Sequence, residues 1–213
     1  MRGVIFDMDG VLVLSEPFIA EAAIRMFAEK GFTVREEEFR PFIGMGEDRF
    51  IGGVAERRGI LLEPARDKAR TYAIYDELVR GRLRPTPGAR EFVRVCRARG
   101  LKNAVASGAD RVKVDANLRE LGLTRSDFDA VIDGDQVTRK KPAPDIFLAA
   151  CRALDLPPRE CLVVEDAVSG VQAAKAAGTR CLALTTSFDT TALREADWTA
   201  SDLAHVPEAA LDW

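Results

Sequence analysis

Histidine is almost absent from this chain, which contains a single one, His205. Zinc sites usually take several histidine or cysteine ligands, and a Ser-His-Asp triad needs a histidine beside its nucleophile. His205 stands beside Val206-Pro207, where a surface or packing role is the ordinary one. The scarcity of histidine therefore argues against both kinds of site.

Cysteines at metal-binding spacing are missing as well. None of the four cysteines forms a C-x-x-C pair, and all stand far apart in apolar stretches: Cys96, Cys151, Cys161 and Cys181. We expect them to be reduced core residues, which predicts a cytoplasmic protein. The strand-like run Val4-Ile5-Phe6 comes at once, without a signal-peptide pattern, in agreement with that expectation.

Neither a long apolar run nor an excess of one charge is present. No apolar stretch approaches the roughly 20 residues that a bilayer-spanning helix needs. The formal net charge is −3, and the basic residues are scattered. We therefore expect no membrane and no nucleic-acid partner, and we expect a monomer.

What the chain does have is a regular alternation of short apolar runs and segments with helical periodicity. The apolar runs predict buried strands at 3–6, 102–106, 130–132, 161–164 and 181–184. The periodic segments predict helices at 89–99, 111–121, 144–154 and 168–177. Strands that alternate with helices in short units indicate an α/β fold with a Rossmann-like parallel sheet covered on both faces.

The segment from residue 15 to residue 83 interrupts this alternation because it contains no convincing strand. Amphipathic stretches at 16–30, 36–42, 48–58 and 64–83 predict helices instead. We expect an all-helical cap domain at 15–83, inserted into an α/β core made of residues 1–14 and 84–213.

Polar side chains follow several of the predicted strands, at the edge where open α/β sheets bind their ligands. Asp7 and Asp9 follow the first strand, Ser107-Gly108 the second, and Glu165-Asp166 the fourth. The loop after the third strand carries Lys141 into the next helix. We expect these side chains to converge on one crevice.

The chemistry of this set points to a metal-assisted reaction of a phosphoryl group. Asp7 and Asp9 stand two apart in an extended segment, so their side chains share one face and repel each other unless a cation intervenes. With Asp166 and Glu165 they form a set of hard oxygen ligands that suits Mg²⁺. A carboxylate such as Asp7 can attack phosphorus and form an aspartyl-phosphate.

Positive partners and an acid complete that chemistry. Lys141, the Ser107 hydroxyl and loop N–H groups can stabilise the charge on the transferring group. Asp9 can protonate the departing alkoxide and later accept a proton from the attacking water. We expect the partner to be a small phosphorylated metabolite.

Each signal is weak when it is taken alone. Asp-x-Asp-Gly also forms tight turns, and Ser107-Gly108 is a common helix-capping pair. Lys141 could be a solvated surface lysine, and Glu165-Asp166 could simply begin a helix with favourable charge. The coincidence of all four at successive strand ends favours a site.

Four motifs follow one another along the chain, and together they resemble the haloacid dehalogenase (HAD) superfamily. They are Asp7-Met8-Asp9-Gly10-Val11-Leu12, Ala106-Ser107-Gly108, Lys141-Pro142-Ala143-Pro144-Asp145-Ile146-Phe147 and Val163-Val164-Glu165-Asp166. Lys-Pro-x-Pro-x-x-Phe is especially specific to the branch that contains phosphoglycolate phosphatases and β-phosphoglucomutase, and residues 168–178 resemble the helix that follows the last motif there. The resemblance covers essentially the whole chain, with the helical insertion at the place of that branch's cap.

The resemblance implies a role for each motif residue. Asp7 would be the nucleophile and a Mg²⁺ ligand, and Asp9 the general acid and base, with its backbone carbonyl on the metal. Ser107, Gly108 and Lys141 would bind phosphate. Asp166 would be a metal ligand and Glu165 a direct or water-mediated one. Because dehalogenases of the superfamily usually lack the second aspartate, Asp9 favours phosphoryl transfer.

The chain departs from that branch just after the first motif. Relatives often read Asp-Ser-Glu-Pro-x-His, whereas this chain reads Leu14-Ser15-Glu16-Pro17-Phe18-Ile19. Ile19 stands where phosphomutases carry a histidine, so a sugar-phosphate mutase remains the alternative rather than the first choice. A non-enzymatic phospho-aspartate receiver and a degenerate scaffold are further alternatives, although a receiver carries its acceptor on a later strand and no motif residue is missing here.

The cap contains a glycine-rich loop, residues 42–49, that resembles the substrate-specificity loop of the same branch. Glycines let its backbone approach a ligand closely. We expect Glu47 and Arg49 of this loop, together with Glu16, to contact the leaving group of the substrate. A helix start with acidic residues explains Glu47 equally well.

Overall fold

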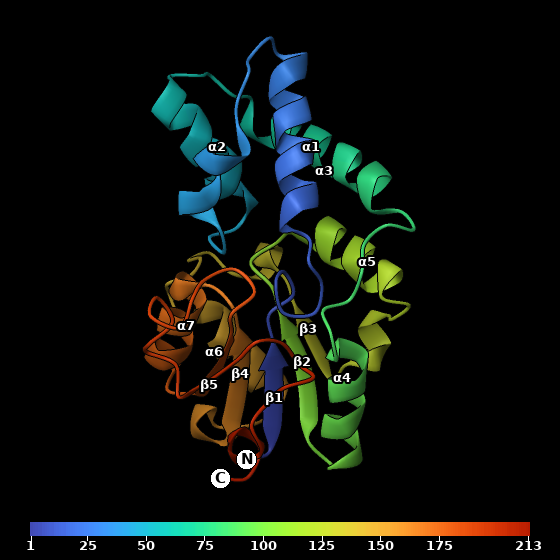
Figure 1. The fold of residues 1–213 in the computed structure, drawn as a ribbon, viewed down its shortest axis with the longest axis vertical. Coiled ribbons are helices and arrows are strands. Elements are labelled where there is room, and N and C mark those ends of the chain that lie inside the picture. Colours follow the sequence, from blue (N-terminus) through green and yellow to red (C-terminus); the bar gives the residue numbers. More distant parts are fainter.

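A parallel sheet forms the centre of the computed structural model, which describes residues 1–213 (Figure 1). The strand order is β3-β2-β1-β4-β5-β6, and every neighbouring pair is parallel. The strands are β1 (Gly3–Phe6), β2 (Lys102–Ala106), β3 (Ala130–Ile132), β4 (Cys161–Glu165), β5 (Arg180–Leu184) and β6 (Trp198–Ala200). Because β1 lies between β2 and β4, the residues that follow it reach the middle of the carboxyl edge.

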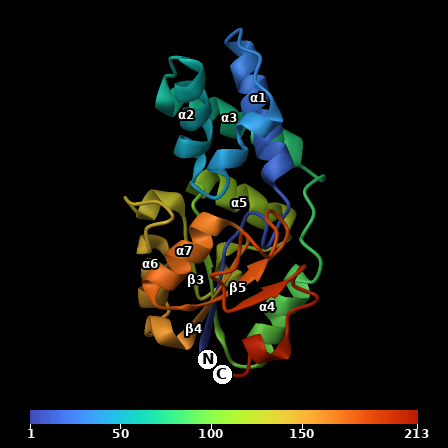
Figure 2. The same ribbon diagram turned by 60° about the vertical axis from the view of Figure 1, so that its left-hand side comes forward.

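Both faces of the sheet are buried, and alternate residues of each strand pack on opposite sides. On β1, Val4 and Phe6 join a core cluster that contains Phe92 of α4 (Ala89–Ala98), whereas Ile5 joins a second cluster with Phe147 of α6 (Asp145–Ala153). In Figure 2 the sheet lies between α4 on one side and α6 with α7 (Val168–Ala177) on the other. Burial on both sides explains the continuous apolar runs of these strands.

Three further helices form a layer beyond the carboxyl edge of the sheet (Figure 1). They are α1 (Glu16–Glu29), α2 (Glu47–Arg58) and α3 (Pro64–Val79). The Phe39 ring stacks on Phe50 of α2 with their centroids 4.8 Å apart. An antiparallel bridge joins Val13 and Pro85, where the chain leaves the core and returns to it. The layer formed by α1, α2 and α3, here called the cap layer, therefore lies next to the end of β1.

The α/β fold with a parallel sheet is confirmed, and most predicted elements appear within a residue or two of their expected bounds. The helix predicted at 36–42 is wrong in type, because the structure has two short 3-10 turns, Glu36–Glu38 and Arg40–Phe42. Pro41 lacks the N–H that a continuous α-helix requires there. The helix predicted at 64–83 ends at Val79, shortly before Gly81 takes a positive φ of 67°.

The edge strand β6 was not predicted from the sequence. It pairs only with β5, and its Trp198 is half-buried while Thr199 is exposed, so it lacks an apolar run. None of the helices combines the length and the apolar character needed to cross a lipid bilayer. The division into a core (1–14 and 84–213) and a cap (15–83) stays a prediction, to which the separate layer of helices adds support.

We predict that Gly88→Ala destabilises the protein more than Gly178→Ala. Both glycines have a φ of +79°, where an L-residue costs about 1–2 kcal/mol. A Cβ at Gly88 would lie 2.3 Å from the backbone nitrogen of Ala204, whereas nothing lies within 4 Å at Gly178. The clash should add about 1–3 kcal/mol to the loss of unfolding free energy at Gly88. Urea unfolding of both variants measures the difference, and equal losses would contradict the close packing at Gly88.

Candidate active site

The carboxyl edge of the sheet gathers polar groups from four neighbouring strands. The Asp7 N–H donates to the Val164 carbonyl of β4 at 2.9 Å, and the Ser107 N–H donates to the Ile132 carbonyl of β3 at 3.0 Å. Both residues thus extend the pairing of their strands by one step. Their side chains are consequently fixed at the point where the strands end.

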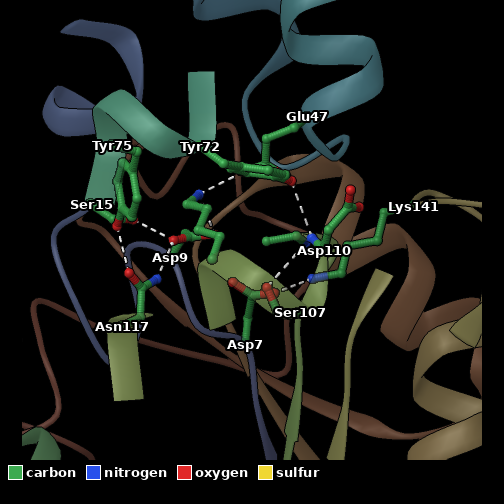
Figure 3. A network of polar contacts seen from close by, with 12 residues as sticks. Asp7, Asp9, Ser15, Glu47, Tyr72, Tyr75, Ser107, Asp110, Asn117 and Lys141 are labelled. Atoms are coloured by element: carbon green, nitrogen blue, oxygen red, sulfur yellow. Dashed lines mark hydrogen bonds and ion pairs between the residues drawn. The ribbon is translucent and has the colours of Figure 1, made fainter. Parts of the chain in front are cut away.

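Lys141 bridges two of the predicted site carboxylates (Figure 3 shows its contact with Asp7). Its ammonium donates to Asp7 Oδ1 and, at 2.5 Å, to Glu165 Oε1, and its side chain is only 2% exposed. The other oxygen of Glu165, Oε2, accepts the N–H groups of Asp166 and Ala167 at 2.7 and 2.8 Å. Glu165 therefore holds both Lys141 and the start of α7, and all its contacts are to protein donors.

The crowding of buried carboxyl groups shifts their ionisation. Burial raises the pKa of Asp7 to about 7, because the attraction of Lys141 does not offset desolvation together with repulsion from Glu165 and Asp9. Burial and the charges of Glu16 and Glu165 hold the pKa of Asp166 well above its usual range. Burial and the nearby Asp9 raise the pKa of Glu16 to about 8. The site thus has more acid groups than its own cations can stabilise as anions.

Two hydroxyl groups that the sequence did not single out lie beside Asp166, both from the loop after β5. Ser187 Oγ donates to Asp166 Oδ2, whereas Thr186 Oγ1 donates to the Gly10 carbonyl at 2.7 Å and lies 3.4 Å from Asp166 Oδ2. Gly10 makes room for this carboxyl: a Cβ there would lie 1.9 Å from Asp166 Oδ2. Hydroxyls at the end of a fifth strand were the signal that could have identified Thr186 and Ser187.

Asp9 is held by donors from outside its own motif (Figure 3). Ser15 Oγ and, at 3.1 Å, Asn117 Nδ2 donate to its Oδ1, and Lys113 Nζ donates to Oδ2 at 2.9 Å. Lys113 and Asn117 lie four residues apart on α5 (Arg111–Glu120), and both are buried. Two buried polar side chains on one helical face were the only sequence signal for them.

Ser107 and Gly108 lie beside these acids. The Ser107 side chain is fully buried, and its Oγ accepts the Ala109 N–H at 3.1 Å. Gly108 and Ala109 line a small cavity between the cap layer and the sheet. The expected phosphate-binding groups are therefore close to Asp7, while their contact with a phosphate stays a prediction.

The cavity encloses about 50 Å³ and is strongly acidic. Its charged lining consists of Asp7, Asp9, Glu16, Glu47, Glu165, Asp166 and a single cation, Lys113. The cap closes it with the glycine-rich loop: a Cβ at Gly44 would lie 2.7 Å from Ala167 Cβ, and one at Gly46 would lie 3.1 Å from the Gly108 carbonyl. Backbone of the cap loop thus lies directly against the sheet edge.

The predicted specificity residues fall in two places. Glu16 and Glu47 line the cavity, and Glu47 Oε2 is buried without a hydrogen-bond partner. Arg49 does not line it: its guanidinium pairs with Glu56 at 2.8 Å, and its side chain is 52% exposed. To reach a leaving group, Arg49 would have to release Glu56, so its substrate role stays a prediction without structural support.

The donor set fits a hard cation by its chemistry, since the acidic lining offers carboxylate oxygen and no thiolate or imidazole. As the side chains stand, no group of three or more His, Cys, Asp or Glu residues is arranged to hold a metal ion. Asp7, Asp9 and Asp166 are instead paired with Lys141, Lys113 and Ser187, respectively. The expected ligand set of Asp7, Asp9, Asp166 and Glu165 therefore stays a prediction.

Comparison with known proteins identifies the family of this chain. The family model for haloacid dehalogenase-like hydrolases matches residues 1–178. Protein SUPPRESSOR OF QUENCHING 1, chloroplastic, of Arabidopsis thaliana is 47% identical over 92% of this chain, which spans 19% of that protein's length. Phosphorylated carbohydrates phosphatase of Thermotoga maritima is 34% identical over 84% of this chain and 82% of its own.

A solved structure matches the entire fold. CbbY from Rhodobacter sphaeroides in complex with phosphate superposes with a TM-score of 0.92 at 28% identity, and the match covers 100% of both chains. The chain belongs to the haloacid dehalogenase-like hydrolase family, and it is an enzyme of the phosphatase group within that family.

Proposed function

We propose that the protein is a magnesium-dependent phosphatase that hydrolyses small phosphate monoesters through an aspartyl-phosphate on Asp7. One observation carries the proposal: Asp7 follows the central strand β1 and lines an acidic cavity, with the Lys141 ammonium on one of its oxygens and Asp9 lining the same cavity. The Thermotoga maritima relative is named a phosphorylated carbohydrates phosphatase, which agrees with a small phosphorylated substrate.

The first half of the reaction transfers the phosphoryl group to the protein. An Asp7 carboxylate oxygen attacks phosphorus, a new P–O bond forms, and the bond to the leaving oxygen breaks. Lys141, the Ser107 hydroxyl and backbone N–H groups near Gly108 stabilise the charge on the equatorial oxygens. Asp9 gives its proton to the departing alkoxide.

The second half releases inorganic phosphate. Asp9, now a carboxylate, accepts a proton from a water molecule that attacks phosphorus, and the bond between phosphorus and the Asp7 oxygen breaks. Asp7 and the protonated state of Asp9 are thereby regenerated. The cap layer restricts the access of bulk water to the acyl phosphate during the cycle.

Bound Mg²⁺ would supply positive charge that neutralises the phosphate and keeps Asp7 ionised. Asp7, Asp166 and the backbone carbonyl of Asp9 would hold it, with Glu165, which also pairs with Lys141, as a direct or water-mediated ligand. Support comes from the excess of buried carboxyl groups over buried cations around the cavity and from the elevated pKa values of Asp7 and Asp166.

We further infer that the cap meets the leaving group through Glu16 and Glu47. Glu47 Oε2 is a buried acceptor without a donor, and such an atom is costly unless a ligand supplies one. Hydroxyl groups of a substrate are donors of the required kind. These two acidic groups disfavour leaving groups that carry a carboxylate.

A cytoplasmic location and a monomeric state remain expectations. All four cysteines are unpaired and buried, which is compatible with a reducing compartment. The Arabidopsis thaliana relative is named chloroplastic.

Asp7→Asn should abolish phosphate release from p-nitrophenyl phosphate, because an amide cannot act as the nucleophile. Rapid acid quenching of the wild-type enzyme should trap a protein heavier by one phosphoryl group, located on Asp7 by peptide mass spectrometry. Asp212→Asn is the matched control, since Asp212 is an exposed partner of Arg99. Retention of wild-type kcat by the Asp7 variant would contradict the proposed mechanism.

EDTA should remove activity, and Mg²⁺ should restore it. Mg²⁺ should also stabilise the folded wild-type protein, by about 2.7 kcal/mol at a hundredfold excess over Kd. Asp166→Asn should lose most of this stabilisation, measured as the shift in Tm with added Mg²⁺, whereas Asp212→Asn should keep it. Full activity after exhaustive chelation would exclude the metal.

A sugar monophosphate should yield phosphate and no isomer, even when the corresponding bisphosphate is added as an activator. Ile19 lines the cavity. It stands at the position where mutases of this branch carry histidine, and its hydrocarbon side chain cannot form a hydrogen bond with Asp9. Product analysis by ³¹P NMR separates the two outcomes. Isomerisation that outpaces phosphate release would favour the mutase alternative.

A further inference from the structure

Lys113 is a buried cation whose position the reaction outlined above does not explain. It belongs to α5 of the core, and its side chain is 3% exposed. Its ammonium donates to Asp9 Oδ2 at 2.9 Å and to Glu47 Oε1 at 2.7 Å. Lys113 therefore joins the expected general acid of the core to the first turn of α2 in the cap.

The contacts of Asp9 leave its carboxyl group little freedom to rotate. Lys113 holds Oδ2, while Ser15 and Asn117 hold Oδ1. The Asn117 side chain is in turn fixed by the Tyr75 hydroxyl of α3, which donates to Asn117 Oδ1. Removal of the Lys113 contact would free one oxygen and let the carboxyl group turn away from the leaving group.

Glu47 fixes the lysine itself. A buried ammonium is costly unless it is paired, and the two carboxylates supply that pairing. Because Glu47 lies on α2 and Asp9 follows β1, the Lys113 ammonium joins the two layers while the cap loop is seated against the sheet edge. The orientation of Asp9 is thereby linked to the closed arrangement of the two layers.

We propose that Lys113 is a positioning residue that orients Asp9 for proton transfer to the leaving group, with Glu47 as its anchor in the cap. The proposal rests on the proposed function, because it assigns Asp9 the role of general acid. In this proposal, the side chain that orients Asp9 belongs to the core helix α5. The cap residue Ile19, at the position where phosphomutases of this branch carry histidine, has an apolar side chain and cannot take that role.

A purely structural role for Lys113 predicts a different result. As a simple clamp between cap and core, it would affect all substrates alike. Lys68 is the matched control for such a clamp, because it pairs with Asp48 at 2.8 Å and with Asp110 at 2.7 Å and has no contact with Asp9. Lys68→Met thus removes a lysine that joins α3 to the start of α5 without touching the acid.

The test compares kcat/KM for an alkyl phosphate with that for 2,4-dinitrophenyl phosphate, whose leaving group needs no protonation. For each substrate, kcat/KM reports the steps up to and including transfer of the phosphoryl group onto Asp7. Lys113→Met should lower kcat/KM for the alkyl substrate about 10²-fold and for the dinitrophenyl substrate by about threefold or less. Lys113→Arg, which keeps the charge, should recover part of the loss, and Lys68→Met should change both substrates by the same factor.

Equal losses of Lys113→Met on both substrates would overturn the proposal and leave Lys113 as a clamp. If that variant is unfolded by circular dichroism, Lys113→Gln, which removes the charge but keeps a polar side chain, replaces it and is read in the same way. Asp7→Asn should abolish turnover of both substrates. An active Asp7→Asn variant would refute the proposed function. An inactive Asp7→Asn variant, together with equal losses of Lys113→Met on the two substrates, would refute only this inference.

Discussion

The burial of many like charges at one edge of the sheet is the constraint on which the arrangement of this protein depends. Six carboxyl groups line a cavity of about 50 Å³, and such a group is costly to bury as an anion without a partner. Two buried lysines relieve this cost, each shared by two carboxylates: Lys141 from the loop before α6, and Lys113 from α5. Helices that cover opposite faces of the sheet are thus tied to the same site.

Part of this site was accessible from the sequence because parallel strands end at a common edge. Asp7, Ser107 and Asp166 each follow a run that is apolar because both sheet faces are buried, so their position could be predicted from local pattern alone. Lys113 and Asn117 could not be predicted, since a helical residue reveals its partner only when the packing of α5 against the cap is known. Arg49 turns outward to pair with Glu56, seven residues further along α2, and the sequence offers no sign of which acidic neighbour an exposed arginine selects.

Asp9, the general acid of the proposed mechanism, takes its polar support from the core and from the exit to the cap. The aspartate keeps its place after the central strand, and the cap contributes the apolar Ile19 nearby. Polar support comes instead from Ser15 at the exit to the cap and from two residues one helical turn apart on α5. The hydrogen bonds of Asp9 in this chain thus come from Ser15 and α5 and not from the side chain at position 19.

The tight seating of Gly44 and Gly46 against the sheet edge has a kinetic consequence. A space of this size admits a few water molecules and no phosphorylated metabolite. Under the proposed mechanism, the helical layer must therefore move away from the sheet edge to admit the ester and to release the alcohol and the phosphate. Such gating steps limit turnover in many enzymes, and solvent viscosity then becomes a determinant of the maximal rate.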